Sequence, residues 1–206
     1  MRGAALVKAV VFDFGNVLAM VDRLRSCSRL ARHSPLPAAQ ICGRIWGGEI
    51  EREAETGRID SRQLFRRIKE AISGESGWSY EEFRAEFMDG FHPNPEGIEA
   101  FKQAHARAGR VFIISNTSYL HARWLFEQEE LATLPEAFIF SFKVGFMKPD
   151  PRIWLKLLEL ACLEAEECLY IDDVGDYCAA AAGLGFPTIH YLRGQTPLLQ
   201  ELSRWL

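Results

Sequence analysis

The stretch Leu6-Val-Lys-Ala-Val-Val-Phe-Asp-Phe-Gly-Asn-Val-Leu18 decides the fold of this chain. Its first seven residues are mostly apolar and rich in valine, which is typical of a strand buried inside a sheet. The Asp-Phe-Gly-Asn sequence that follows is typical of a turn. We therefore predict a buried strand over residues 6–12 that ends immediately before Asp13.

Four later segments repeat this design of a short apolar run followed by polar or turn residues. They cover residues 110–114, 137–142, 168–171 and 187–192. Helical segments separate them, and Asn94-Pro95 and Asp150-Pro151 are typical of helix starts over 95–108 and 152–160. A third helix is predicted over 177–184, closed by Gly185. Strands that alternate with helices predict an α/β fold with a doubly wound, Rossmann-like parallel sheet.

The segment from residue 21 to residue 91 differs because it contains no convincing strand. Capping-box patterns begin at Asp60 and Ser79, and apolar residues recur behind them at helical spacing. We expect a helical cap domain over residues 21–91, inserted into an α/β core domain built from residues 1–20 and 92–206.

Composition excludes several classes of protein. With 24 Lys+Arg against 28 Asp+Glu, the net charge of −4 predicts no nucleic-acid or membrane partner. The N-terminus gives no signal peptide, and no apolar run approaches the roughly 20 residues of a membrane span. The five cysteines form no C-x-x-C pair, so we expect neither disulfides nor zinc, but buried free thiols in a reducing cytoplasm.

Polar residues follow the predicted strands at the edge where parallel sheets bind ligands. They are Asp13, the Ser115-Asn116-Thr117 segment, Lys148 and the Asp172-Asp173 pair. Two carboxylates at one edge repel each other unless a hard cation such as magnesium lies between them, and Asp13 and Asp173 are suitable ligands. Lys148 and Ser115 would then hold phosphate oxygens, while Asp13 attacks phosphorus to form an acyl phosphate.

These residues also carry a resemblance to a known family. Phe12-Asp-Phe-Gly-Asn-Val-Leu18, Ile114-Ser-Asn-Thr117, Lys148-Pro149 and Ile171-Asp-Asp173 resemble, in order, the four motifs of the haloacid dehalogenase superfamily. The similarity covers essentially the whole chain. The cap stretch Glu53-Ala-Glu-Thr-Gly-Arg-Ile-Asp60 resembles the helical-cap branch that contains bacterial sugar-phosphate phosphatases and the phosphatase domain of soluble epoxide hydrolase.

The resemblance implies a role for each matching residue. Asp13 would be the nucleophile, Asp173 a magnesium carboxylate, Lys148 a catalytic lysine, and Ser115 and Asn116 substrate-binding residues. The expected activity is magnesium-dependent hydrolysis of a small phosphorylated metabolite, for instance a sugar phosphate.

Two positions depart from the family pattern. Most family phosphatases carry an aspartate two residues after the nucleophile as their general acid and base, but this chain has Gly15 there. The Gly15 carbonyl can still bind magnesium, and Glu55 of the cap is our candidate for the proton donor. The second departure is Tyr177, since Asp176 lies one residue before the acidic position of the fourth motif. Asp176 either supports the metal through water or caps a helix beginning at Tyr177.

Two alternatives compete with a phosphatase. An L-2-haloacid dehalogenase also uses an aspartate nucleophile and needs no acid at position 15, but it needs no magnesium. A binding or regulatory protein with lost turnover would also tolerate Gly15. Other polar and aromatic residues receive simpler interpretations: no histidine is assigned to catalysis, Trp46 is expected to pack, and the Arg23-Leu-Arg25 stretch is expected to be a solvated helix face.

Overall fold

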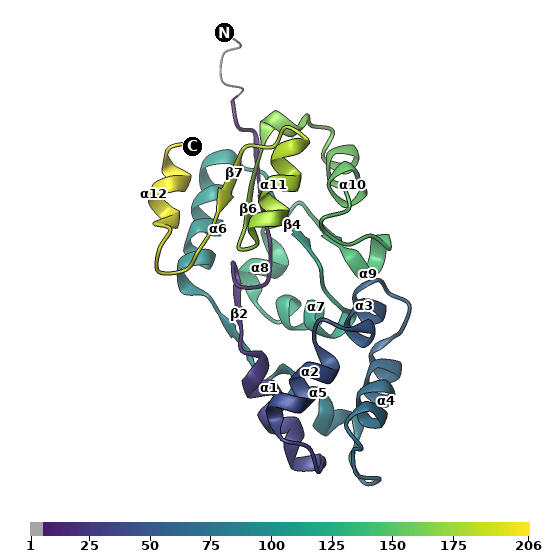
Figure 1. Ribbon diagram of the computed structural model, residues 1–206. Coiled ribbons are helices and arrows are strands. Elements are labelled where there is room, and N and C mark those ends of the chain that lie inside the picture. Colours follow the sequence, from purple (N-terminus) through teal and green to yellow (C-terminus); the bar gives the residue numbers. More distant parts are fainter. Residues whose placement is uncertain (1–5) are drawn as a thin grey trace.

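The computed structural model describes residues 6–206, so residues 1–5 of the predicted core domain lie outside the described residues. A five-stranded parallel sheet forms the centre of the molecule, with strand order β5-β4-β1-β6-β7 (Figure 1). Its strands are β1 (Ala9–Phe12), β4 (Val111–Ser115), β5 (Ala137–Phe140), β6 (Cys168–Asp172) and β7 (Thr188–His190). This is the predicted doubly wound α/β arrangement, with the first strand at its centre.

Both faces of the sheet are covered, and the sequence shows why. Alternate residues of one strand point to opposite faces, so Val10 and Phe12 join one apolar cluster while Ala9 and Val11 join another. Helices α6 (Pro95–Ala108) and α12 (Leu198–Ser203) contribute to the first cluster, as do α7 (Tyr119–Phe126) and α8 (Glu129–Thr133). Helices α10 (Arg152–Ala161) and α11 (Gly175–Gly183) contribute to the second.

Several predicted element boundaries need correction. Strand β5 ends at Phe140 instead of residue 142, and helix α9 (Ser141–Val144) follows directly. The buried Ser141 hydroxyl accepts a hydrogen bond from the backbone N–H of Thr117, which turns the chain out of the sheet. Helix α11 begins at Gly175, two residues early, so the exposed Asp176 lies in its first turn and does not cap it. Helix α6 begins after its N-cap Asn94 and ends at its C-cap Gly109, as predicted.

Five helices lie between β2 and β3 and share a separate apolar cluster, seen in the lower half of Figure 1. They are α1 (Arg23–Leu30), α2 (Ala38–Ile45), α3 (Glu49–Glu55), α4 (Ser61–Ala71) and α5 (Tyr80–Met88), with a short 3₁₀ turn over Ala31–His33. Both predicted capping boxes, at Asp60 and Ser79, are present. A further 3₁₀ turn, Ala165–Glu167, precedes β6.

A two-stranded antiparallel ribbon, which the sequence did not predict, joins the helical segment to the sheet. Strand β2 (Ala19–Val21) pairs with β3 (Phe91–Pro93), so both connections of the helical segment run side by side. Asn94, directly after this ribbon, is buried and donates hydrogen bonds from its amide to the Val17 carbonyl (2.8 Å) and the Tyr191 hydroxyl (3.2 Å). The ribbon and Asn94 therefore fix where the helices stand relative to the sheet.

The expectation for the cysteines was wrong for three of the five. Cys27 and Cys42 form a disulfide between α1 and α2, although their spacing gives no such signal. Cys168 and Cys178 are buried free thiols as expected, whereas Cys162 is free but exposed. Within residues 6–206, no helix combines the length and the apolar character needed to cross a bilayer.

Candidate active site

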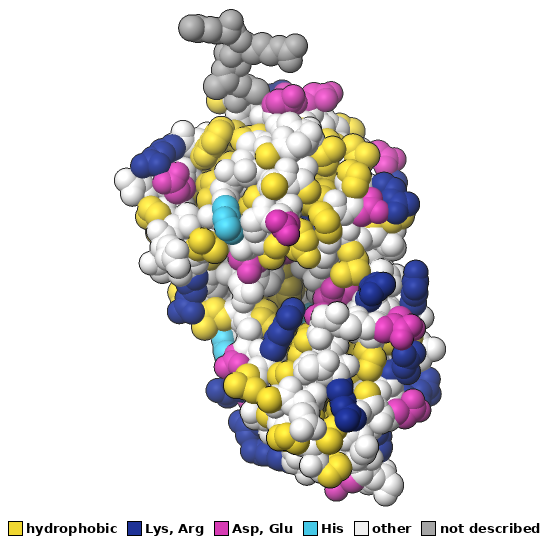
Figure 2. All heavy atoms as spheres, viewed as in Figure 1, with side chains coloured by type: hydrophobic (Ala, Val, Ile, Leu, Met, Phe, Trp, Pro, Cys, Tyr) yellow, Lys and Arg dark blue, Asp and Glu magenta, His cyan; other side chains and the backbone are white. Residues whose placement is uncertain are grey.

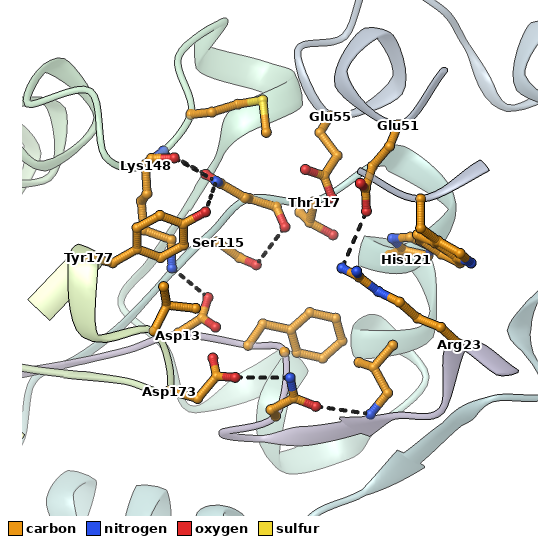
Figure 3. Close-up of a pocket in the computed structure, with 18 of the residues that line it drawn as sticks. Asp13, Arg23, Glu51, Glu55, Ser115, Thr117, His121, Lys148, Asp173 and Tyr177 are labelled. Carbon is orange, nitrogen blue, oxygen red and sulfur yellow. Dashed lines mark hydrogen bonds and ion pairs between the residues drawn. The ribbon is translucent and has the colours of Figure 1, made fainter. Parts of the chain in front are cut away.

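The central strands bring the predicted polar residues to one edge of the sheet. Asp13 follows β1, Ser115 ends β4 and Asp172 ends β6, and these strands are neighbours. A pocket of about 270 Å³ opens at this edge, between the sheet and the helical segment. Figure 2 shows the hollow between the upper and lower halves of the molecule, and Figure 3 shows the residues that face one another across it.

Lys148 is the centre of a buried ionic network. Its side chain is 1% exposed, and Nζ donates to Asp13 Oδ1 (2.7 Å) and to Asp172 Oδ2 (2.6 Å). Burial alone would lower the pKa of Lys148, but the negative charges of Asp13 and Asp172 and the hydrogen bond to Asp13 outweigh burial and raise this pKa. Lys148 is therefore a permanent cation in contact with the predicted nucleophile.

Asn116 holds this lysine in place. Its side-chain Oδ1 accepts from the Lys148 backbone N–H (2.7 Å), and Nδ2 donates to the Lys148 carbonyl (2.9 Å). Nδ2 also lies 3.3 Å from the Tyr177 hydroxyl. The amide of Asn116 is therefore engaged with the backbone of Lys148, and its contact with substrate stays a prediction. Ser115, the other predicted phosphate contact, is buried beside it and lines the pocket.

Asp172 is held on both sides by hydrogen bonds inside the protein. One carboxylate oxygen accepts from Lys148 and from the Tyr170 hydroxyl, and the other accepts from the Val174 backbone N–H (2.8 Å). Both carboxylate oxygens of Asp172 therefore already accept hydrogen bonds from protein groups. Asp172 supplies a buried negative charge that fixes the lysine.

Asp13 and Asp173 differ from Asp172 because each keeps an oxygen free. Asp13 uses Oδ1 for Lys148, and Asp173 uses Oδ2 to accept from the Asn16 amide (2.9 Å). Carboxylate oxygens of all three aspartates lie within 4.8 Å of one another. When all three carboxyl groups are ionised, their charge of −3 and the charge of +1 on Lys148 leave a net charge of −2, which a divalent cation would balance.

The pKa shifts of these carboxyls support a cation site. Burial raises the pKa of Asp13 to about 7, with help from Asp172 and Asp173 and against the attraction of Lys148. Burial likewise raises the pKa of Asp173, although its hydrogen bond from Asn16 acts the other way. Magnesium is a hard cation that prefers oxygen ligands such as carboxylates. A bound cation would also relieve the repulsion between these carboxylates. The residues present therefore fit magnesium, with Asp13, Asp173 and the Gly15 carbonyl as candidate ligands.

Gly15 leaves open space next to the nucleophile. A methyl group built at its α-carbon would meet nothing closer than Asp13 Oδ2 and a Val21 methyl, both at 4.0 Å. Gly15 is therefore not required by crowding, and the position that carries an acid in most related phosphatases holds no side chain here.

Glu55 lines the same pocket from the helical segment, and Figure 3 shows it near Thr117 and Glu51, across the pocket from Asp13. It is the last residue of α3, and the next turn passes close to the core because Gly57 packs against the Phe142 backbone. Gly57 has a φ of +72°, and a β-carbon there would lie 2.2 Å from the Phe142 carbonyl oxygen. Burial, followed by repulsion from Glu51, raises the pKa of Glu55 to about 8. Glu55 therefore carries a proton at neutral pH.

The sequence interpretation missed four residues of the far wall of the pocket: Arg23, Trp46, Glu51 and His121. Arg23 is the first residue of α1, after the Asp22 cap, and was expected to be a solvated residue. His121 and Trp46 were given no functional role. The one available signal was the spacing of Glu51 and Glu55, because residues four apart share a helix face.

Comparisons with known proteins agree with this geometry. The family of haloacid dehalogenase-like hydrolases matches residues 7–185. The protein named Phosphatase MT3486 from Mycobacterium tuberculosis is 28% identical over 184 residues, which cover 87% of this chain and 84% of that protein. D-ribitol-5-phosphate phosphatase from Bacteroides thetaiotaomicron is 21% identical over 189 residues, which cover 89% of this chain and 91% of that protein.

A solved structure shows the same fold. A haloacid dehalogenase family enzyme from Bacteroides thetaiotaomicron, in complex with magnesium and inorganic phosphate, superposes with a TM-score of 0.80 at 21% identity. The superposition covers 93% of this chain and 97% of that one. Since the family match spans most of its length and the fold agrees, the chain belongs to the haloacid dehalogenase-like hydrolases and is an enzyme of that family.

Proposed function

We propose that the enzyme is a magnesium-dependent phosphatase that hydrolyses a small phosphate monoester through an aspartyl-phosphate on Asp13. The observation that carries the proposal is the state of this carboxylate. One oxygen is fixed by Lys148, the other is free beside Gly15, and Asp173 lies close enough to share a cation. A nucleophile held in this way needs no movement to meet phosphorus.

The substrate phosphate would be held by groups that surround Asp13. Ser115 and Lys148 both line the pocket, and backbone N–H groups directly after Asp13 and Ser115 would add further donors in this proposal. Magnesium bound by Asp13, Asp173 and the Gly15 carbonyl would withdraw charge from the phosphoryl oxygens. This chemistry matches the net charge of −2 among the buried ionic groups, which by itself would repel a phosphate.

The reaction needs one proton transfer in each half. The free oxygen of Asp13 forms a bond to phosphorus while the ester oxygen leaves, and that oxygen takes the proton from Glu55. Water then attacks the phosphorus of the acyl phosphate, and the Glu55 carboxylate accepts its proton. Inorganic phosphate leaves, and Asp13 and Glu55 return to their starting states.

The helical segment over residues 21–91 acts, in this proposal, as a cap that supplies Glu55 and closes the pocket. The relatives support a phosphatase, because two of them are named as phosphatases. The name of one of these two specifies a phosphorylated polyol as its substrate. The substrate is accordingly proposed to be a small phosphorylated metabolite such as a sugar or polyol phosphate.

The test is phosphate release from a panel of small phosphate monoesters, with and without magnesium. Asp13→Asn keeps the size of the side chain but removes its charge, and should lower kcat by at least about 10³-fold. Asp60→Asn is the matched control, since Asp60 is exposed, lies outside the pocket lining, and is replaced by a residue that caps helices equally well. Full activity of the Asp13 variant would refute the assigned nucleophile.

A further inference from the structure

The far wall of the pocket, opposite Asp13, carries one positive charge on Arg23 and one negative charge on Glu51. Arg23 Nη2 lies 3.4 Å from Glu51 Oε1, and the Arg23 guanidinium lies 4.9 Å from the centre of the Trp46 ring. Glu51 Oε2 also accepts from the Gly47 backbone N–H. Figure 3 shows Arg23 and Glu51 pointing toward the space in front of Asp13 and Lys148. The guanidinium is therefore placed by a carboxylate and an aromatic face, with further N–H donors left for a ligand.

His121 adds a polar atom to this wall without adding charge. Its ring is stacked against Trp46 (5.8 Å between centres) and Phe91 (4.8 Å), and it is buried. Burial, together with the positive charge of Arg23, lowers the pKa of His121 to about 3, so the ring is neutral. Among residues 6–206, neither its Nε2 nor the Trp46 indole nitrogen has a hydrogen-bond partner. Two buried polar atoms near the pocket are thus left unpaired.

We infer that Arg23, Glu51, Trp46 and His121 form a leaving-group subsite that accepts an uncharged, hydroxyl-bearing group and rejects one with a second negative charge. The inference rests on the proposed phosphatase function. Hydroxyl groups both donate and accept, so they can use the Arg23 N–H groups and the Glu51 carboxylate together. A leaving group with a carboxylate could pair with Arg23 only while its charge faces Glu51, which opposes its binding.

The alternative is a purely structural ion pair that ties α1 to α3. Two observations favour the subsite. The Arg23 side chain is 56% exposed and faces the pocket, and an ion pair this open adds little to stability. In addition, Glu51 and Glu55 lie on one face of α3, so the pair lies one helical turn from the proposed proton donor.

The test compares two substrates with the same three-carbon skeleton, glycerol 3-phosphate and 3-phosphoglycerate, with p-nitrophenyl phosphate as the reference. The wild-type enzyme should have the higher kcat/KM for glycerol 3-phosphate. Glu51→Gln removes the charge that repels a carboxylate. The ratio of kcat/KM for glycerol 3-phosphate to kcat/KM for 3-phosphoglycerate should therefore fall by on the order of 10-fold. Arg23→Gln leaves Glu51 uncompensated, so the same ratio should rise.

The two shifts of opposite sign separate a subsite from a structural role, which would lower both rates together. Glu53→Gln is the matched control, because Glu53 lies on the same helix but pairs with Arg67 (2.8 Å) outside the pocket lining. An unchanged ratio in both variants, with p-nitrophenyl phosphate still hydrolysed, overturns the subsite alone. No phosphate release by the wild-type enzyme from any of the three compounds overturns the phosphatase proposal and the subsite with it.

Discussion

Replacing Glu55 by glutamine removes a proton from the cap side of the pocket while keeping the shape of the side chain. The pKa of about 8 means that about 90% of Glu55 is protonated at pH 7, against about 0.3% for a glutamate at its ordinary pKa of 4.5. Burial therefore increases the available acid by roughly 300-fold. Loss of a general acid typically lowers the rate by about 10²–10⁴-fold, so Glu55→Gln should fall in that range.

The assay measures kcat/KM for an alkyl phosphate and for p-nitrophenyl phosphate in parallel. An alkoxide needs a proton to leave, whereas p-nitrophenolate leaves without one, so the loss should be confined to the alkyl phosphate. The acid form of Glu55 is the active form, so activity should fall as the pH rises through about 8. This decline should be absent in Glu55→Gln.

A second substitution makes the result decisive. Gly15→Asp places a carboxyl group in the open space beside Asp13, where its β-carbon meets only ordinary contacts at 4.0 Å. In the Glu55→Gln background it should restore part of the alkyl phosphatase activity. Equal losses for both substrates, or no loss at all, would refute the role of Glu55. Glu53→Gln again serves as the control on the same helix.

Two further properties follow from the structure. Removing magnesium with EDTA should abolish phosphate release and added magnesium should restore it, whereas chloride release from a 2-haloacid in EDTA would show that the enzyme is a dehalogenase. Asn94→Ala should lower the free energy of unfolding by about 1–3 kcal/mol, measured by urea denaturation, because it leaves the buried Val17 carbonyl unpaired. An unfolding free energy equal to that of the wild type would contradict this account of Asn94.

The half of the candidate site that lies on the sheet could be predicted, because each of its residues has a recognisable local sequence pattern. Asp13, Ser115 and Asp172 each follow an apolar run that can only be a buried strand, and parallel strands place their carboxyl ends together. The ligand-binding edge of the sheet therefore follows from strand ends alone, without knowledge of any contact between distant residues.

The remaining features depend on contacts between distant segments. The chain brings Lys148 back against Asn116, whose amide is engaged with the backbone of Lys148. Arg23 and His121 have no pattern that distinguishes a pocket residue from a solvated or packed one. The ribbon of β2 and β3 has three residues in each strand, too few to show an alternating pattern.

The loss of an acid at Gly15 changes how selectivity and catalysis are connected. When the proton donor lies next to the nucleophile, any bound phosphate can be cleaved. In this enzyme the proposed donor is Glu55, one helical turn from Glu51, so the same helix would recognise the leaving group and protonate it. A leaving group that displaces α3 loses its proton source together with its binding contacts. Discrimination would therefore act on kcat as well as on KM, because poorly fitting groups meet a site without an acid.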